Sequence, residues 1–490
     1  MEQRSIAKWE TFTRWFSGPD REDAYQSVEF TAEFTCRNRR MWVRGFYDGD
    51  GRYGLRMMPD SEGTWRYETT SNVPELNGQT GAFECGPAAS HGPVVVEKTG
   101  RLARLAYADG TDYSCVGTTC YCWTHQGEEM ENQTLETLKN GPFNKIRMCI
   151  FPKHYLYNAN DPAHFPFPGG KTEGGYQWDF SKFDPEYWRH LEKRIGQLRE
   201  MGIEADLILF HPYDRWGFAD MPRETDLAYL RYAVARLAGF RNVWWSFANE
   251  YDLMRNKTML DWDDYFRLVA EEDPAGHLRS IHNCNGFYDY GKPWVTHCSI
   301  QSSDIEKTPR WLEEYEKPVV IDECCYEGNI PDSWGNIPAQ EMVNRMWTGF
   351  ALGGYVGHGE TYLSPDQVLW WSKGGVLHGQ APQRIQFLRK IMESMPQHPA
   401  FAREYPWRVD GLDYGQRKFL YYFGVRQPGE KHYQLPEGAK YRAEIFDAWN
   451  MTVEDAGVYT GTADIALPLT ADFAPLLDGS LALVRWPRLA

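Results

Sequence analysis

Two glutamates that close apolar segments are the residues best placed to do chemistry. Glu250 follows the aromatic and apolar segment 242–248, and Glu323 follows the apolar segment 318–321. Burying an ionised carboxylate without a partner is costly, so such a residue must be paired, hydrogen-bonded or used. If both segments are strands of one sheet, the two carboxyls meet at the same edge. That arrangement suits glycoside hydrolysis, in which one carboxyl protonates the leaving oxygen and the other attacks the sugar carbon or activates water.

The region 100–395, which contains both glutamates, alternates between strand and helix patterns. Amphipathic helical repeats occupy 185–201 and 227–238, among others. Eight segments have the composition of buried strands: 113–119, 144–151, 203–210, 242–248, 278–282, 295–300, 318–322 and 353–358. Eight β/α units over about 300 residues favour an α/β fold, a (β/α)8 TIM barrel. A doubly wound sheet is the alternative, but no glycine-rich phosphate loop follows the first strand.

Both ends of the chain have the pattern of short strands separated by turns. With 490 residues the chain is too long for one core. We expect an N-terminal β-sandwich over 1–95, joined by a linker at 86–93, and a small C-terminal β-sandwich over 400–490. The N-terminal domain is expected to support the barrel or shape its substrate site rather than to act as an independent carbohydrate-binding module.

The composition argues against some classes of binding partner. The net charge of −16 argues against nucleic acid and anionic membranes as partners. No run of about 20 apolar residues exists, and the first residues lack the apolar core of a signal peptide. The ten cysteines show neither metal-ligand nor disulfide spacing, so we interpret them as reduced thiols in a cytoplasmic protein. Self-association is left open.

Further polar and aromatic residues lie at or near the predicted strand ends, where barrel enzymes place their reacting groups. We expect these to bind substrate: Asn249, Arg147, His211, Asp214, Trp216, His282, His297, Gln301, His358, Glu360 and Trp371. The histidines come from separate strands without metal-ligand spacing, so no metal or other cofactor is expected. Glu360 is the main rival as a catalytic carboxylate. Asp214 could equally cap a loop, and Asp206 and Asp322 are expected to make structural hydrogen bonds.

An ordered set of motifs resembles a known family. These motifs are 143–148, 211–218, 243–252, 317–323 and 358–361, with 45–50 and 58–65 in the N-terminal region. Together they are similar to the bacterial apiosidase-like hydrolases of the clan A glycoside hydrolases, a clan of retaining TIM-barrel enzymes. The resemblance covers nearly the whole chain.

The resemblance implies roles for individual residues. Glu250 would be the general acid/base and Glu323 the nucleophile. Asn249 would bind the sugar 2-hydroxyl, and Arg147 would steady the nucleophile. Either His282 or His297 would contact the nucleophile, and the sugar-binding residues of the eighth strand match the clan pattern less closely.

The expected mechanism needs two carboxyls about 5–5.5 Å apart. At that distance the pKa of one rises, and Arg147 beside Glu323 would keep Glu323 ionised and place the proton on Glu250. We therefore predict a retaining, exo-acting β-glycosidase that releases a monosaccharide from small oligosaccharides or glycosides. The alternatives are an endo-acting glycanase, a non-catalytic carbohydrate-binding barrel and a metal-dependent barrel enzyme that uses the histidines, and the sugar and linkage remain open.

Overall fold

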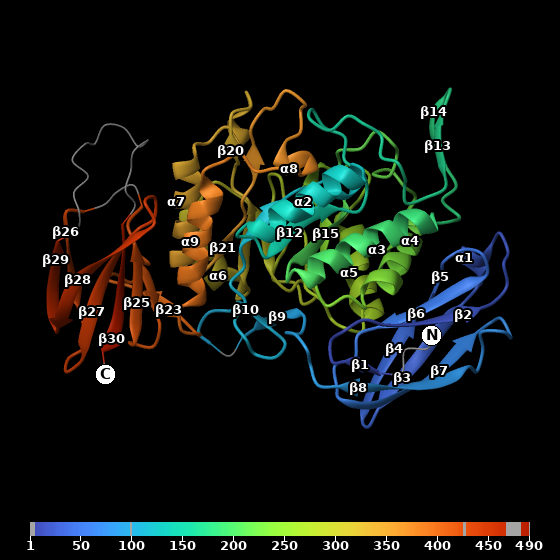
Figure 1. Cartoon of the computed structure of the whole chain (residues 1–490), viewed down its shortest axis with the longest axis horizontal. Helices are drawn as coiled ribbons and strands as arrows, with labels where there is room; N and C mark the ends of the chain where they lie inside the picture. The colour runs from blue at the N-terminus through green and yellow to red at the C-terminus, as the bar shows by residue number, and fades with distance from the viewer. Residues whose placement is uncertain (1–4, 99, 425–427, 467–481, 490) are drawn as a thin grey trace.

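The computed structural model describes residues 5–98, 100–424, 428–466 and 482–489. Figure 1 shows a central region of helices and strands between two β-rich regions, the N-terminal one in blue and the C-terminal one in red.

The N-terminal region contains two sheets. One has the strand order β1 (Ser5–Ala7), β8 (Thr80–Gly86), β7 (Gly63–Ser71), β3 (Phe30–Cys36) and β4 (Arg39–Arg44). The other has the order β2 (Phe12–Ser17), β6 (Arg52–Met57) and β5 (Phe46–Tyr47), and the short helix α1 (Ala24–Ser27) follows β2. The sheets pack face to face, because Phe12 of β2 stacks on Phe83 of β8 with ring centroids 3.9 Å apart.

The central region has eight parallel strands in two sheets, preceded by the hairpin of β9 (Val94–Glu97) and β10 (Arg104–Tyr107). The first sheet holds β11 (Gly117–Thr119), β12 (Lys145–Cys149), β15 (Glu204–Phe210), β16 (Val243–Ala248) and β17 (Arg279–Ser280). The second holds β18 (Cys298–Gln301), β19 (Val319–Glu323) and β21 (Tyr355–Val356). Isolated parallel bridges join the two sheets, His282 to Ser299 at one edge and Thr118 to His358 at the other. The strands thus follow one another around a ring, in the pairing order of a (β/α)8 barrel.

Each of the eight strands lies within or across a segment predicted from sequence, although several are shorter than expected. Helices and short 3-10 turns lie between them: η1 (Trp123–His125), α2 (Glu128–Asn140), α3 (Pro185–Glu200), α4 (Arg223–Leu237), η2 (Tyr251–Leu253), α5 (Met259–Glu272), η3 (Ile305–Lys307), α6 (Thr308–Tyr315), η4 (Ser333–Gly335), α7 (Ala339–Ala351), α8 (Trp370–Lys373) and α9 (Ala381–Glu393). Local sequence explains where they begin. Asp184 caps α3, with Pro185 in its first turn, and Thr258 and Asp261 form a capping box on α5. Two small ladders, β13 (Gly169–Thr172) with β14 (Gly175–Trp178) and β20 (Glu327–Gly328) with β22 (Glu360–Thr361), complete the region.

A buried charge cluster lies inside the strand ring. Nζ of Lys145 is 2.7 Å from a carboxylate oxygen of Asp206 and 2.7 Å from one of Asp322. Ser299 donates to the other oxygen of Asp322. The structural role expected for the two aspartates is confirmed.

A network of buried ion pairs fixes the N-terminal region to α3 and α4. Asp48 of the β region is 2.7 Å from Arg236, and Arg56 is 2.7 Å from Glu192. Glu192 in turn is 2.6 Å from Arg236. Because the network is buried and crosses the junction, the two regions are held as one scaffold.

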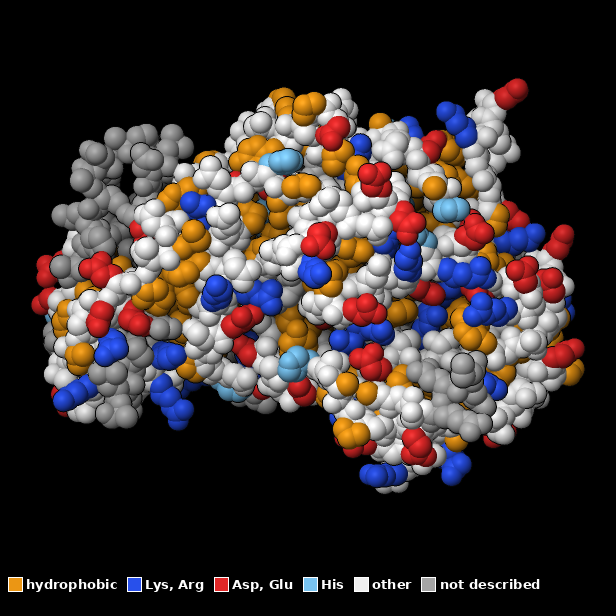
Figure 2. Space-filling view, viewed as in Figure 1, with side chains coloured by type: hydrophobic (Ala, Val, Ile, Leu, Met, Phe, Trp, Pro, Cys, Tyr) orange, Lys and Arg blue, Asp and Glu red, His pale blue; other side chains and the backbone are white. Residues whose placement is uncertain are grey.

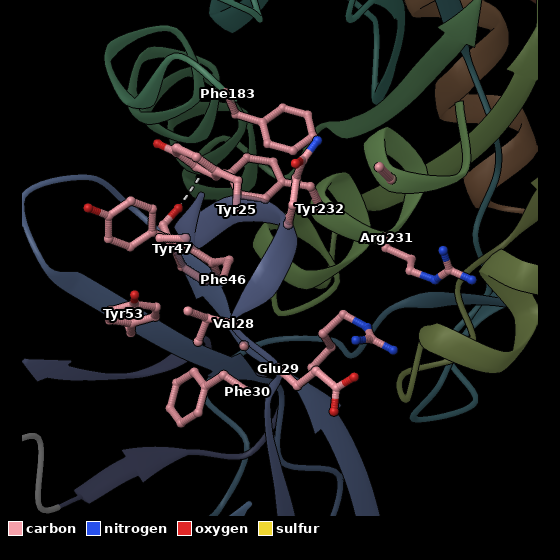
Figure 3. A pocket seen from close by; sticks show the side chains of 15 residues that line it. Tyr25, Val28, Glu29, Phe30, Phe46, Tyr47, Tyr53, Phe183, Arg231 and Tyr232 are labelled. Carbon is pink, nitrogen blue, oxygen red and sulfur yellow. Dashed lines mark hydrogen bonds between the residues drawn. The ribbon is translucent and has the colours of Figure 1, made fainter. Parts of the chain in front are cut away.

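A cavity of about 530 Å³ lies at the same junction (Figure 3). Tyr25, Tyr47 and Tyr53 reach it from the β region, and Phe183 and Tyr232 from the barrel region. The rings of Phe183 and Tyr232 stack 3.9 Å apart, and the Tyr232 hydroxyl donates to the backbone oxygen of Tyr47. These contacts are those of a packed junction.

The C-terminal region is also built of strands. One sheet has the order β23 (Ala400–Ala402), β24 (Gly411–Asp413), β25 (Lys418–Tyr422), β30 (Ala482–Leu489), β27 (Lys440–Asp447) and β28 (Thr452–Thr460). The strands β26 (Glu430–Gln434) and β29 (Thr462–Ala466) pair separately. Parts of the sandwich predicted over 400–490, namely 425–427, 467–481 and 490, lie outside the described residues.

The surface is mixed in charge. Figure 2 shows acidic and basic side chains interspersed over the face in view. Within the described ranges, no helix has both the length and the apolar character needed to cross a bilayer.

Candidate active site

A cavity of about 300 Å³ lies at the carboxyl ends of the parallel strands, where barrel enzymes build their sites. Both predicted glutamates line it. The lining residues are Tyr121, Lys153, Tyr155, Tyr213, Asn249, Glu250, Cys284, Gln301, Ser302, Ser303, Glu323, Cys325, Tyr326, Trp334 and Trp371. Of the residues predicted from sequence, Asn249, Gln301 and Trp371 therefore belong to this wall as well.

Gln301 connects the two glutamates. With its amide turned so that its hydrogen bonds are satisfied, Nε2 of Gln301 donates to Oε1 of Glu250 and to Oε2 of Glu323, each at 3.1 Å. The two oxygens therefore lie no further apart than twice this distance. Such a separation is compatible with the spacing of about 5–5.5 Å in retaining glycosidases.

Glu250 stands at a sharp change of chain direction. It follows β16 and Asn249, and its φ of 51° lies in the left-handed region, which non-glycine residues rarely adopt. Tyr213, from the loop after β15, donates its hydroxyl to Oε2 of Glu250. Each oxygen of this buried carboxylate thus has one donor. Strained backbone of this kind is frequent at functional sites.

Glu323 ends β19 and has a different environment. Its enclosure by protein atoms raises its pKa to about 8, and the nearby Tyr326 hydroxyl offsets only part of this rise. Oε1 of Glu323 and the Tyr326 hydroxyl are both buried without a well-formed hydrogen bond. Both atoms are enclosed by protein and have almost no accessible surface.

The prediction that Arg147 lies beside Glu323 and keeps it ionised is wrong. The Arg147 guanidinium donates to Ser246 at 2.9 Å and to Oδ1 of Asn249 at 3.1 Å, and it lies 3.6 Å from Asp206. Its nearest carboxylates belong to the buried cluster below the cavity. In the unliganded site burial raises the pKa of Glu323, the carboxyl that was predicted to be kept ionised.

Arg147 instead orients Asn249. Oδ1 of Asn249 accepts from Arg147 and also from the Tyr121 hydroxyl at 3.0 Å. Because two donors hold the amide oxygen, the amide nitrogen is the atom left to donate to a ligand in the cavity. This geometry suits hydrogen bonding to a sugar hydroxyl next to the reacting carbon.

Aromatic rings form one wall of the cavity. Trp371 is the centre of this group, with ring centroids 5.1 Å from Trp334, 5.7 Å from Tyr155 and 5.8 Å from Tyr121. Flat apolar surfaces of this kind suit the faces of a sugar ring. Trp371 lies in α8, and this short helix packs beside β11, the first strand of the ring.

Several predicted binding residues lie elsewhere. His211, His282, His297 and His358 are buried and absent from the cavity wall. Burial lowers the pKa of His211, His297 and His358 to about 3, so all three are neutral. His211 bonds the backbone oxygen of Phe151, and His297 packs against Trp244.

Asp214, Trp216 and Glu360 are also outside the wall. Asp214 accepts the backbone N–H groups of Trp216 and Ala219, as a loop cap. The Trp216 indole donates to Asp161. Glu360 accepts the backbone N–H groups of His378 and Gly379 just before α9, which explains this buried carboxylate without a role in the reaction.

Among the residues that the structure describes, one group of side chains could hold a metal ion. Glu327, His358 and Glu360 place one ligand atom each within 4.8 Å of the others. The carboxylate oxygens of Glu327 already accept from the backbone of Gln380 and Ala381. The backbone N–H groups of residues 378–381, at the start of α9, thus donate hydrogen bonds to the carboxylates of Glu327 and Glu360.

Tyr213, Tyr326, Lys153 and Trp334 were missed as site residues. All four follow a strand end by two or more residues, in loops whose path the sequence does not specify. Their position after a predicted barrel strand was the available signal, because such loops build the site of this fold.

Comparison with known proteins agrees with the site. Residues 100–398 match the model of the family described as "Apiosidase-like, catalytic domain". The chain belongs to this family. A crystal structure of a proposed glycoside hydrolase from Bacteroides vulgatus ATCC 8482 is 36% identical, with a TM-score of 0.92, over 99% of this chain and 100% of the other.

More distant structures share the fold of this apiosidase-like chain. A family 5 glycoside hydrolase from the same Bacteroides strain is 16% identical, with a TM-score of 0.61, over 81% of this chain and 94% of the other. Residues 5–72 and 407–473 match two domains of unknown function, DUF5060 and DUF5605. No curated protein matches the sequence. Together the family and the 36%-identical relative indicate that the chain is a glycoside hydrolase.

Proposed function

We propose that the chain is a retaining β-glycosidase that uses Glu323 as nucleophile and Glu250 as general acid/base. The observation that supports this most is the shared donor, Nε2 of Gln301, which holds one oxygen of each carboxyl at 3.1 Å in a single cavity. In the first step Glu323 attacks the sugar carbon and Glu250 protonates the leaving oxygen. In the second step Glu250 removes a proton from water, which displaces Glu323 from the sugar.

The surroundings support these roles. Glu323 lines the cavity and its Oε1 has no hydrogen-bond partner, whereas both oxygens of Glu250 have a donor. When the substrate displaces the remaining solvent, Glu323 must be ionised, and the Tyr326 hydroxyl next to it is the donor available to stabilise that charge. Asn249 would bind the 2-hydroxyl with its amide nitrogen.

The cavity supports exo action on small glycosides. About 300 Å³ with an aromatic wall suits one sugar ring and its linkage rather than a long glycan. We further propose a cytoplasmic enzyme that acts on small imported glycosides. An endo-acting enzyme would need subsites on both sides of the reacting bond.

One observation favours the reverse assignment. The pKa of about 8 for Glu323 in the unliganded site is that of a proton donor near neutral pH. A retaining enzyme with Glu323 as acid and Glu250 as nucleophile is therefore the second candidate.

Azide rescue distinguishes the candidates. Glu250→Ala, Glu323→Ala and the control Glu173→Ala, an exposed glutamate, would be assayed on a panel of aryl β-glycosides with and without sodium azide. We expect losses of about 10²- to 10⁴-fold for Glu250→Ala and larger ones for Glu323→Ala. Azide should then yield the α-glycosyl azide with Glu323→Ala and the β-glycosyl azide with Glu250→Ala.

Each other outcome has a definite meaning. Exchange of the two anomers between the variants would assign the roles in reverse. Wild-type rates in both variants, on a glycoside that the enzyme cleaves, would show that the pair is structural and would end this proposal.

A further inference from the structure

Lys153 places a buried positive charge on the wall of the catalytic cavity. It lies in the loop after β12 and is 4% exposed. Its Nζ lies 3.4 Å from the ring centroid of Tyr121, 4.3 Å from that of Tyr213 and 5.3 Å from that of Trp371. All three rings also line the cavity. The ammonium therefore sits in an aromatic cage beside the reacting groups.

Comparison with the other buried lysines shows that the surroundings of the Lys153 ammonium are unusual. Within the described chain, four lysines are buried, and three of them give their ammonium to oxygen atoms. Lys145 contacts Asp206 and Asp322, Lys257 contacts Asp226, and Lys317 donates to the backbone oxygens of Tyr290 and Lys292. Among these same described residues, Nζ of Lys153 has no hydrogen-bond acceptor.

The cage explains how this charge survives burial. Ring faces attract a cation through their quadrupole and use none of its N–H donors. Burial lowers the pKa of Lys153, while the nearby Glu250 raises it. Three N–H donors consequently remain available beside the cavity, and leaving them unsatisfied is costly.

The charge balance of the cavity indicates which ligand group would accept hydrogen bonds from the three N–H donors of Lys153. Glu250 and Glu323 line the space, and each carries a negative charge at some stage of the proposed reaction, so an anionic substrate group would be repelled without a cation nearby. A neutral sugar does not require a buried ammonium, because uncharged donors such as Asn249 can also bind hydroxyls. A buried lysine suits an anionic oxygen group, with which it makes strong charge-assisted hydrogen bonds.

We propose that Lys153 recognises an anionic substituent, a carboxylate or a sulfate, on the sugar that occupies this cavity. The substrate class would then be glycosides of uronic acids or of sulfated sugars. The inference rests on the proposed glycosidase site, but it concerns binding and can be measured separately from hydrolysis.

Isothermal titration calorimetry on the full chain tests whether Lys153 recognises an anionic substituent. The probes are D-glucuronate and D-galacturonate against D-glucose and D-galactose, with galactose 6-sulfate to separate sulfate from carboxylate recognition. We expect at least one anionic sugar to bind about 10- to 100-fold more tightly than its neutral partner, with the preference weakening as salt is added. Lys153→Met should abolish the preference and Lys153→Arg should keep part of it.

A matched control guards against general effects. Lys171→Met removes an exposed lysine and should leave the preference unchanged, and circular dichroism would report folding of each variant. If Lys153→Met fails to fold, Lys153→Arg alone is informative, because it keeps the charge but not the compact ammonium geometry. Equal binding of neutral and anionic sugars by the wild type, or a preference that persists in Lys153→Met, would overturn the inference.

The result can be read independently of the proposed function. If neutral aryl glycosides are cleaved and no anionic sugar is preferred, the glycosidase stands and the inference falls. If no glycoside is cleaved but anionic sugars bind through Lys153, the inference stands and the glycosidase falls. Equal loss of neutral and acidic glycoside cleavage in Lys153→Met, with an altered pH profile, would assign the lysine to Glu250 rather than to the substrate.

Discussion

Glu250 and Glu323 share one hydrogen-bond donor, the amide nitrogen of Gln301, at 3.1 Å from each. Glu250 comes from the end of β16 and Glu323 from the end of β19, and Gln301 ends β18 between them in the strand ring. A donor held between two carboxyls stabilises the charged form of both. Gln301 is thus a positioning residue that sets both the separation and the protonation of the pair.

Replacing Gln301 by leucine tests this role. Gln301→Leu keeps the volume but removes the donor, so we expect kcat to fall about 10- to 100-fold and the pH profile of kcat/KM to move to higher pH. The assay is hydrolysis of the best aryl glycoside between pH 5 and 9.5. Ser303→Ala, which changes another cavity wall residue, should leave the profile in place. An unchanged profile in Gln301→Leu would reduce this residue to a packing role.

The pH dependence of the wild type follows from Glu323. Because its pKa in the unliganded site is about 8, and kcat/KM reports the free enzyme, we expect kcat/KM to rise with pH up to about 8 if ionised Glu323 is the nucleophile. Tyr326 lowers this pKa, so Tyr326→Phe should shift the rising limb to higher pH. Tyr155→Phe serves as the control for loss of a cavity hydroxyl. A limb that stays fixed in Tyr326→Phe would show that the Tyr326 hydroxyl does not act on Glu323.

The sequence predicts the positions of the strands better than the paths of the loops. Buried parallel strands have continuous apolar runs, so all eight were placed from sequence, and with them Glu250, Glu323, Asn249 and Gln301. Loop residues such as Tyr213 and Lys153 reach the cavity only through the path of the folded loop. That path depends on contacts distant in sequence.

The histidines show a second limit. Alternate side chains of a strand face opposite sides, so an error of one residue in a strand end changes which side a residue faces. The segment predicted over 278–282 forms a strand only at Arg279–Ser280, and His282 lies buried beyond it. Arg147 illustrates the same point for charges, because its buried partners were identifiable only once Asp206 and Asp322 had been brought beside it.

Lys145 provides a stability prediction. Lys145→Met removes the ammonium that lies 2.7 Å from each of two buried aspartates and leaves them only the more distant Arg147 guanidinium, 3.6 Å from Asp206 and 4.0 Å from Asp322. We expect the free energy of unfolding to fall by about 3–5 kcal/mol. Urea unfolding followed by far-ultraviolet circular dichroism measures it. The exposed Lys171→Met should change stability by less than about 0.5 kcal/mol. A similar small change in Lys145→Met would contradict the assignment of this cluster as a structural core.

Glu204 provides a pH-dependent stability prediction away from the site. This buried carboxyl accepts from the Trp244 indole at 2.9 Å, and burial raises its pKa from 4.5 to about 8. The folded state therefore favours protonated Glu204, whereas the unfolded state ionises it near its ordinary pKa. The resulting stabilisation is complete below about pH 4.5 and is lost as the pH rises to about 8.

Glu204→Gln keeps an oxygen for the indole but cannot ionise. Between pH 5 and 8 the free energy of unfolding of the wild type should therefore fall relative to that of Glu204→Gln, by at most about 1.4 kcal/mol per pH unit, and the two curves should run parallel above pH 8. Urea unfolding at several pH values compares them. Parallel curves over the whole range would mean that Glu204 is ionised in the folded protein, held by a partner such as Arg241 that lowers its pKa.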